Sequence, residues 1–119
     1  MRKTVLFVLA TLGVATPALA APSATIDRTG YTAIAAGDLA AAEQRIVAER
    51  RIFPQRPELM LNLASVYQRT GRVSDARALY AAVLERPAVA MDLPSGAVVS
   101  SHDLATRALG RRLQEIATR

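Results

Sequence analysis

Apolar side chains recur at helical spacing in two runs within residues 57–88. In the first run they stand at positions i, i+3, i+4 and i+7, namely Met60, Leu63, Ala64 and Tyr67. After Gly71, a second run follows the same rule with Val73, Ala76, Tyr80, Val83 and Leu84. Residues at these intervals share one face of a helix, so the pattern predicts two amphipathic helices with a break at Gly71.

Residues 23–56 predict a similar pair of helices. The clearer helix begins after Gly37, with Asp38 as its N-cap and an apolar stripe formed by Leu39, Ala42, Ile46 and Phe53. Its partner, at about residues 27–36, is shorter. Proline suits a first helical turn but not a helix interior. Pro54 and Pro57 are therefore expected to separate the two pairs, and Pro87 to end the second.

The two helix pairs are related by a fixed offset along the chain. At a distance of 34 residues, identical residues occur as Gly37 and Gly71, Ala42 and Ala76, and Ala48 and Ala82. A period of this length is typical of stacked structural repeats, in which each unit packs on its neighbour. Small residues such as Ala64 and Ala76 also allow neighbouring helices to approach closely.

On these residues, the segment 23–88 resembles the tetratricopeptide repeat family, and the chain is similar to a small exported bacterial protein of that family. The second unit fits through Asn62-Leu63-Ala64, Tyr67, Gly71, Ala76, Tyr80 and Val83-Leu84, with Pro87 one residue early. The first unit fits at Gly30, Gly37, Ala42 and Pro54, while Ala33 stands where the family prefers a large aromatic. The resemblance implies an all-α fold of antiparallel helical hairpins, with repeats at about 23–56 and 57–90. The alternative is a generic pair of alanine-rich helical hairpins.

Residues 101–119 are predicted to form a C-terminal amphipathic helix. Ser100 or Ser101 can cap its start, and its apolar stripe is formed by Leu104, Ala108, Leu109, Leu113 and Ile116. Two repeats leave an apolar face uncovered, so this helix is expected to cap the stack. Self-association, in a homodimer for example, is the alternative cover.

Residues 91–100 lie between the second helix pair and the predicted capping helix. They form two short apolar segments around Pro94-Ser95-Gly96, which indicates a loop or a small hairpin. A two-stranded ribbon alone is marginal in water. Met91, Leu93 and Val98 are therefore expected to pack into the core or to contact a partner.

Residues 1–20 have the pattern of a signal peptide. Arg2 and Lys3 precede a nearly unbroken apolar run from Val5 to Val14, and Ala18-Leu19-Ala20 supplies small residues for cleavage after Ala20. The run is shorter than the roughly 20 apolar residues of a membrane span. We therefore expect a periplasmic or secreted protein. The alternative is a retained anchor, and membrane contact is expected only in that case.

Composition narrows the possible partners and chemistry. The chain of 119 residues has a formal net charge of +5, which falls to +3 when Arg2 and Lys3 are removed. Its arginines are scattered and its aromatics few, so nucleic-acid binding is not expected. The lack of cysteine excludes disulfides and thiolate chemistry.

The sequence contains none of the motifs whose spacing implies catalysis or phosphate binding. His102 and Asp103 are neighbours, and neighbouring residues on a helix do not face each other. His102 is therefore expected to be a surface residue. No enzymatic activity, metal or cofactor is expected. The pairs Arg50-Arg51 and Arg111-Arg112 could instead bind an anion or a lipid headgroup, although a solvated helix face is the usual role of such pairs.

The family resemblance implies that the first helix of each unit lines a concave binding surface. The candidate partner-binding residues there are Asp27, Tyr31, Ile34, Glu58, Leu61, Ser65, Gln68 and Arg69. Tyrosine and arginine often dominate interface energetics, and a glutamine amide can hydrogen-bond an extended peptide. We therefore expect a non-catalytic scaffold or adaptor of the cell envelope that binds a segment of another protein. The alternatives are a self-associating helical protein and a small anion or lipid-headgroup binder.

Overall fold

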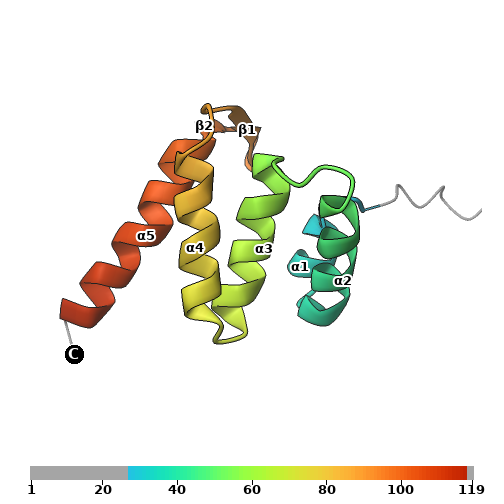
Figure 1. Ribbon diagram of the computed structural model, residues 1–119, viewed down its shortest axis with the longest axis horizontal. Coiled ribbons are helices and arrows are strands. Elements are labelled where there is room, and N and C mark those ends of the chain that lie inside the picture. Colours follow the sequence, from blue (N-terminus) through green and yellow to red (C-terminus); the bar gives the residue numbers. More distant parts are fainter. Residues whose placement is uncertain (1–26, 118–119) are drawn as a thin grey trace, which may run out of the picture.

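The computed structural model describes the backbone of residues 27–117 and the side chains of residues 27–111. Within this part, the elements in chain order are α1 (Tyr31–Ala35), α2 (Leu39–Arg50), α3 (Pro57–Arg69), α4 (Val73–Leu84), β1 (Ala90–Asp92), β2 (Val98–Ser100) and α5 (Ser101–Ala117). The helices stand side by side, from α1 and α2 through α3 and α4 to α5 (Figure 1). The predicted all-α fold of helical hairpins with a C-terminal capping helix is confirmed.

The predicted signal peptide, with its cleavage site after Ala20, lies outside the described residues. Among residues 27–117, no helix combines the length and the apolar character that crossing a bilayer requires.

The first helix pair has one short helix and one regular helix. In α2, Asp38 acts as the predicted N-cap, because its Oδ1 accepts a hydrogen bond from the Ala41 amide at 3.1 Å. α2 ends at Arg50, so the prediction that Phe53 continues the apolar stripe is wrong, and that ring is 45% exposed. α1 begins only at Tyr31, after Gly30 in the left-handed region at φ 70°.

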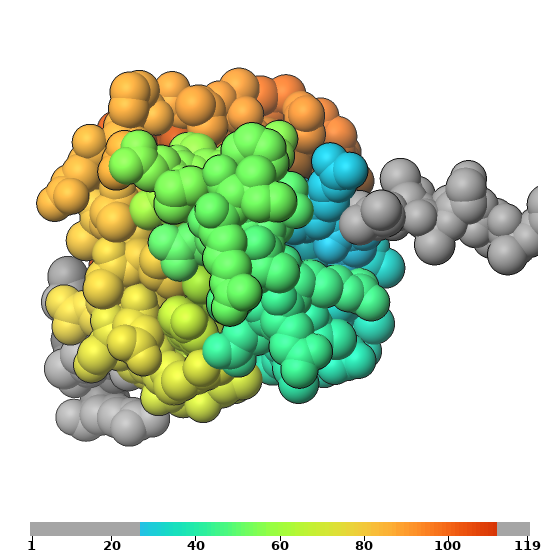
Figure 2. Space-filling view, turned by 45° about the vertical axis from the view of Figure 1, so that its right-hand side comes forward, coloured from blue at the N-terminus to red at the C-terminus, as the bar shows by residue number. Residues whose placement is uncertain are grey.

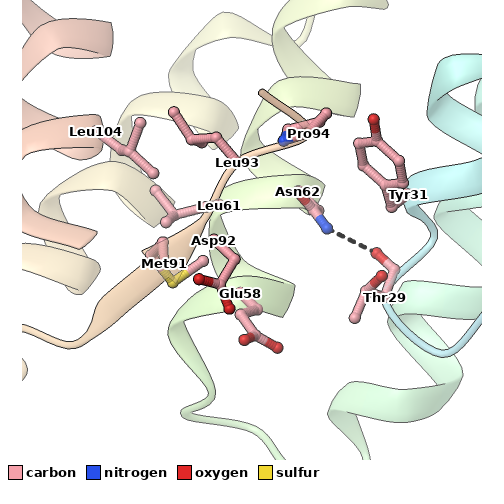
Figure 3. A pocket seen from close by; sticks show the side chains of 10 residues that line it. All are labelled: Thr29, Tyr31, Glu58, Leu61, Asn62, Met91, Asp92, Leu93, Pro94 and Leu104. Atoms are coloured by element: carbon pink, nitrogen blue, oxygen red, sulfur yellow. Dashed lines mark hydrogen bonds between the residues drawn. The ribbon is translucent and has the colours of Figure 1, made fainter. Parts of the chain in front are cut away.

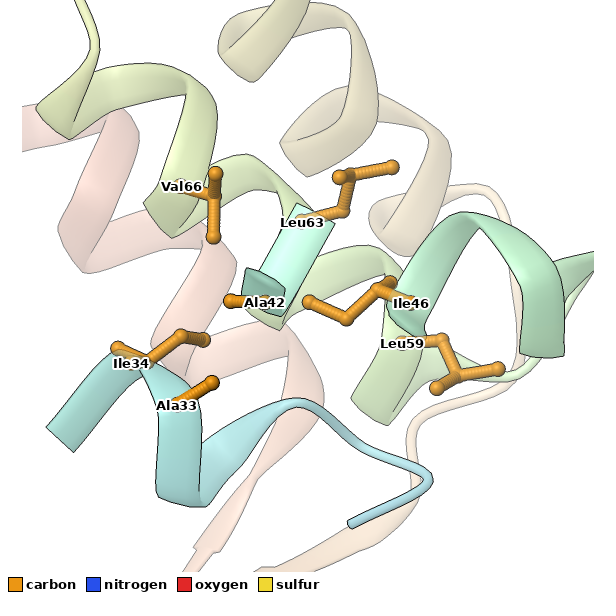
Figure 4. Packing of buried hydrophobic residues seen from close by; sticks show 7 residues of the cluster. All are labelled: Ala33, Ile34, Ala42, Ile46, Leu59, Leu63 and Val66. Carbon is orange, nitrogen blue, oxygen red and sulfur yellow. The ribbon is translucent and has the colours of Figure 1, made fainter. Parts of the chain in front are cut away.

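Helix α3 is the central element because it is buried on two sides. Leu59, Leu63 and Val66 pack against α1 and α2 in a first cluster with Ala33, Ile34, Ala42 and Ile46 (Figure 4). Met60, Leu61 and Ala64 face the other way, into a second cluster with Ala76, Tyr80, Val83 and Ala105. The single stripe expected from the sequence is therefore too narrow for this helix.

Besides this core, the two helix pairs also contact each other at one end of the stack. The connection between α2 and α3 lies against the segment that follows α4 (Figure 2), where the Arg86 guanidinium donates a hydrogen bond to the Gln55 amide oxygen. In α4, Ala76, Tyr80 and Val83 are buried as predicted. Leu84 is 37% exposed, because it is the last residue of the helix and lies off the buried face.

A small antiparallel hairpin connects α4 to α5. β1 pairs with β2 so that Met91 stands opposite Val99, and the turn includes Gly96 at φ 82°. Of the two expected arrangements of residues 91–100, the structure thus has the hairpin. Met91 packs against the second cluster, whereas the expectation that Val98 enters the core is wrong, since that residue is 64% exposed.

Helix α5 covers the open side of the second cluster. Ser100 caps it by accepting a hydrogen bond from the His102 amide at 3.2 Å, while the buried Ser101 hydroxyl accepts one from the Val89 amide at 3.0 Å. Ala105 is fully buried, and Leu104, Ala108 and Leu109 pack beside it. The side chains of Leu113 and Ile116, which were predicted to extend this stripe, lie outside the described residues.

Candidate functional site

One end of α3 forms the wall of a hollow beneath the hairpin, called here the hairpin hollow. It has a volume of about 300 Å³ and is lined by Thr29, Tyr31, Glu58, Leu61, Asn62, Met91, Asp92, Leu93, Pro94 and Leu104. Figure 3 shows Leu61, Met91, Leu93 and Leu104 on one side and Tyr31 with Thr29 on the other. The hollow is therefore apolar along one wall and bounded by a half-exposed aromatic ring along the other.

Polar groups fix the geometry of the hairpin hollow. The Asn62 Nδ2 group donates a hydrogen bond of 2.9 Å to the Thr29 carbonyl, which ties α3 to the segment before α1 (Figure 3). Its Oδ1 atom remains as an acceptor for a ligand. Glu58 and Asp92 add two carboxylates to the lining. Arg56, which precedes α3, lies with its Nε atom 3.6 Å from Glu58 Oε2.

The other end of α3 borders a second hollow, called here the arginine hollow. Its volume is about 350 Å³, and its lining consists of Ser65, Gln68, Arg69, Tyr80, Ala108 and Arg111. The Tyr80 hydroxyl donates a hydrogen bond of 3.2 Å to Gln68 Oε1, so the Gln68 Nε2 group remains as a donor.

In the arginine hollow, burial and nearby charges act on the pKa of Tyr80 in opposite directions. Burial raises the pKa of its phenol above the ordinary value of 10.0, while the charges of Arg111 and Arg69 act in the opposite direction. The hydroxyl is thus a protonated hydrogen-bond donor at neutral pH. Arg69 and Arg111 line the same hollow as Tyr80.

The two hollows follow one face of α3. Glu58, Leu61, Asn62, Ser65, Gln68 and Arg69 are spaced at i, i+3, i+4, i+7, i+10 and i+11, which places them along the same side of the helix. Across from them, Leu104, Ala108 and Arg111 have the corresponding spacing on α5. We call the face of α3 that carries both hollows, with the part of α5 across from it, the α3 groove.

Comparison with known proteins finds a family that the helical segment resembles. Residues 33–89, from within α1 to the residue before β1, match the family model described as Tetratricopeptide repeat. This segment is similar to the tetratricopeptide repeat family. Neither the curated proteins nor the solved structures contain a match to the chain. Tetratricopeptide repeats generally mediate protein–protein interactions and are typically not catalytic.

The fold brings most of the predicted site residues into the α3 groove. Tyr31, Glu58 and Leu61 line the hairpin hollow, and Ser65, Gln68 and Arg69 line the arginine hollow. Leu61 contributes to the floor, since it is 8% exposed.

Two predicted residues, Ile34 and Asp27, line neither hollow. Ile34 belongs to the first cluster and has almost no surface for a partner. The Asp27 carboxylate accepts a hydrogen bond from the Ala33 amide at 3.1 Å and lies 3.5 Å from Arg45 Nη1. Both side chains therefore stabilise the first repeat, which gives them a structural role at the edge of the groove.

Sequence reasoning missed several residues of the groove. Asn62 could have been found from the helical spacing, because it lies one turn from Glu58 on the same face. The contributions of Met91, Asp92 and Leu93 depend on how the hairpin folds back, and no spacing rule indicates this. Tyr80 and Arg111 reach the groove from α4 and α5, outside the first helices of the repeats.

The other candidate groups have structural partners. His102 is half-buried, and its Nε2 atom lies 2.6 Å from the Arg86 carbonyl oxygen, to which it donates a hydrogen bond. His102 thus lies at the start of a helix, as predicted, but is only partly exposed. Arg50 donates through Nη2 to the Pro54 carbonyl at 3.5 Å. Within residues 27–111, no three His, Asp or Glu side chains are grouped so that they could hold a metal ion.

Proposed function

We propose that this chain is a non-catalytic interaction module that binds an extended segment of a partner protein in the α3 groove. The observation that carries the proposal is the placement of two hollows on a single face of α3. The similarity of residues 33–89 to the tetratricopeptide repeat family supports a role in protein–protein interaction.

The groove offers the kinds of contact that an extended peptide needs. The apolar wall of the hairpin hollow can receive a large apolar side chain, whose burial contributes about 2 kcal/mol. Asn62 offers an acceptor and Gln68 a donor, because one amide atom of each is already engaged within the protein. These amides lie six positions apart on α3, so they can hydrogen-bond the backbone of a ligand at two separate points.

We further propose that the module works in the cell envelope, after export and cleavage behind Ala20. The support is the sequence pattern of residues 1–20, with its basic start, apolar run and small residues. Mass spectrometry of the protein from a periplasmic fraction tests this directly. A mature form that begins at Ala21 is expected, whereas an intact N-terminus recovered with membranes would indicate an anchor.

An affinity pull-down with the full chain tests the binding role. The C-terminally tagged protein is compared with Arg69→Glu, which changes the arginine hollow, and with Arg77→Glu, which changes an exposed residue of α4 that lines neither hollow. Circular dichroism first shows that both variants remain helical. We expect a stoichiometric partner that Arg77→Glu retains and Arg69→Glu loses.

Other outcomes of the pull-down contradict the proposal. A partner retained equally by both variants would show that binding occurs away from the α3 groove. Recovery of this chain alone would favour self-association, which light scattering at micromolar concentration can then test.

A further inference from the structure

The α3 groove carries charges of opposite sign at its two ends. Glu58 and Asp92 belong to the lining of the hairpin hollow, and Arg69 and Arg111 to that of the arginine hollow. Among the residues that the structure describes, Asp92, Arg69 and Arg111 take part in none of the ion pairs. Within residues 27–111, these three charges thus have no side-chain ion-pair partner.

The Arg56–Glu58 ion pair does not cancel the acidic end. Its two side chains are 47% and 41% exposed, and exposed ion pairs contribute little. Arg56 lies outside the lining of the hairpin hollow and stands 5.5 Å from the Phe53 ring centroid. Glu58 and Asp92 thus remain the charged groups that a ligand in this hollow would meet.

The spacing of the two ends sets a length for the ligand. Glu58 and Arg69 are eleven positions apart on α3, which corresponds to about 16 Å at the rise of an α-helix. An extended chain covers this distance in about five residues. Since alternate side chains of an extended chain face the same way, the two ends should be reached by groove-facing side chains about four or six residues apart.

We propose that the α3 groove selects an extended peptide with a basic side chain at the hairpin hollow and an acidic side chain at the arginine hollow. Between them, next to the basic residue, an apolar side chain enters the hairpin hollow against Leu61 and Leu104. This inference rests on the proposed function and adds the chemistry and the charge order of the partner segment. The argument for it is charge complementarity at both ends of one groove.

Fluorescence anisotropy with a panel of defined peptides tests the charge order. The peptides are acetylated and amidated, so that their termini carry no charge, and contain one leucine between two variable positions set four or six residues apart. Lysine and glutamate occupy these positions in all combinations and in both chain directions. The full-length protein is titrated at low salt, where charge effects are largest.

We expect a peptide with one lysine and one glutamate to bind at least about tenfold more tightly than either single-sign peptide, in one chain direction. This fold-change corresponds to the combined strength of two exposed charged contacts, since the Asp92, Arg69 and Arg111 side chains are exposed. A charge-reversed protein, Arg69→Glu/Arg111→Glu, should instead prefer the all-lysine peptide. Arg77→Glu, the matched control, should keep the preference of the parent.

A reversal of preference cannot result from unfolding, because an unfolded variant loses binding to every peptide. Equal affinity for all charge combinations would overturn the inference and leave the proposed function standing. Lack of binding to the whole panel would also overturn it, and the pull-down with Arg69→Glu would then decide separately whether the groove binds a partner.

Discussion

The first repeat opens with a helix of 5 residues, α1, where the second opens with a helix of 13 residues, α3. Pro57 starts α3 at a position that suits proline, with Glu58 in the first turn. α1 has neither feature, and its start depends on Gly30 and on the Asp27 carboxylate that accepts the Ala33 amide. Among the described residues, the first repeat packs mainly on α3, and local polar contacts at α1 add to this burial.

Asp38 in the first repeat and Arg72, 34 residues later in the second, occupy equivalent positions but have different roles. Asp38 caps α2 through its own carboxylate. Its counterpart, Arg72, makes no such cap at α4 but reaches back to Glu43 in α2 with two hydrogen bonds, of 2.8 and 2.6 Å. Arg72 also stacks over the Tyr67 ring at 4.3 Å. At this position, the first repeat thus has a contact within one helix, whereas the second has a contact between the repeats.

This asymmetry shapes the groove. The first repeat contributes only Thr29 and Tyr31 to the described lining, while α3 contributes residues along its length. The wall opposite α3 is supplied by α5 and by the hairpin. Because different elements lie beside the two ends of α3, the two ends of the groove differ in charge.

The largest loss of stability should come from a cavity in the core between the repeats. Leu63 is 1% exposed and packs on Ile46 and its neighbours in the first cluster. Leu63→Ala should lower the free energy of unfolding by about 3 kcal/mol, because it removes buried methyl groups and leaves a cavity. The exposed Leu84 provides the control, and Leu84→Ala should cost less than about 1 kcal/mol. Urea denaturation followed by circular dichroism measures both, and equal losses would contradict the assignment of the core.

A smaller loss of stability is expected at Gly30, where the backbone of the first repeat approaches α2. A Cβ atom at Gly30 would lie 2.6 Å from Ile46 Cγ1, and φ is also positive there. Gly30→Ala should therefore cost about 2 kcal/mol through strain and overpacking together. Gly71 has a similar φ of 81° but nothing within 4 Å of the added Cβ, so Gly71→Ala should cost about 1 kcal/mol from backbone strain alone. If the two variants have equal stability, steric contact at Gly30 does not limit the first repeat.

Loss of the cap formed by Asp27 should lower the free energy of unfolding by about 1 kcal/mol. Asp27→Ala removes the acceptor of the Ala33 amide and the contact with Arg45. Hydrogen exchange should then become faster at Ala33 and Ile34 in α1, with little change in α4. Asp38→Ala, which removes the cap of α2, serves as the comparison, and its faster exchange should be centred on Ala41. Uniformly faster exchange in every helix would show that α1 has no local role of its own.

Periodicity was sufficient to predict the fold where burial lies on one side of a helix. Ala42, Ile46, Ala76 and Val83 are buried as their spacing predicts. The same reasoning failed where burial is two-sided or absent. It missed Leu59 and Val66, because α3 packs on both neighbours. It also extended the α2 stripe to Phe53, because Pro54 limits the helix end only to within a few residues and α2 already ends at Arg50.

The groove was predictable only for the residues carried by the first helix of each repeat. Glu58, Ser65 and Arg69 follow from helical spacing together with the family resemblance. Asp92 and Arg111 do not, since their positions depend on long-range packing of the hairpin and α5 against α3. The opposite charges of the two ends therefore became visible only in three dimensions.

The smallest effect is expected at the contact between the repeats, and it should depend on pH. The hydrogen bonds from Arg72 hold the pKa of the Glu43 carboxyl below its ordinary value of 4.5. A lowered pKa in the folded state stabilises the protein above the unfolded-state pKa, and this contribution disappears as the pH falls through the folded-state pKa. Glu43→Gln should therefore melt below the parent protein at pH 7, and the difference should shrink as the pH falls below 4.5. Arg72→Lys keeps the charge but not the paired geometry, so its melting temperature at pH 7 should lie between those of the parent protein and Glu43→Gln. A difference in melting temperature that stays constant with pH would show that the ion pair does not join the repeats.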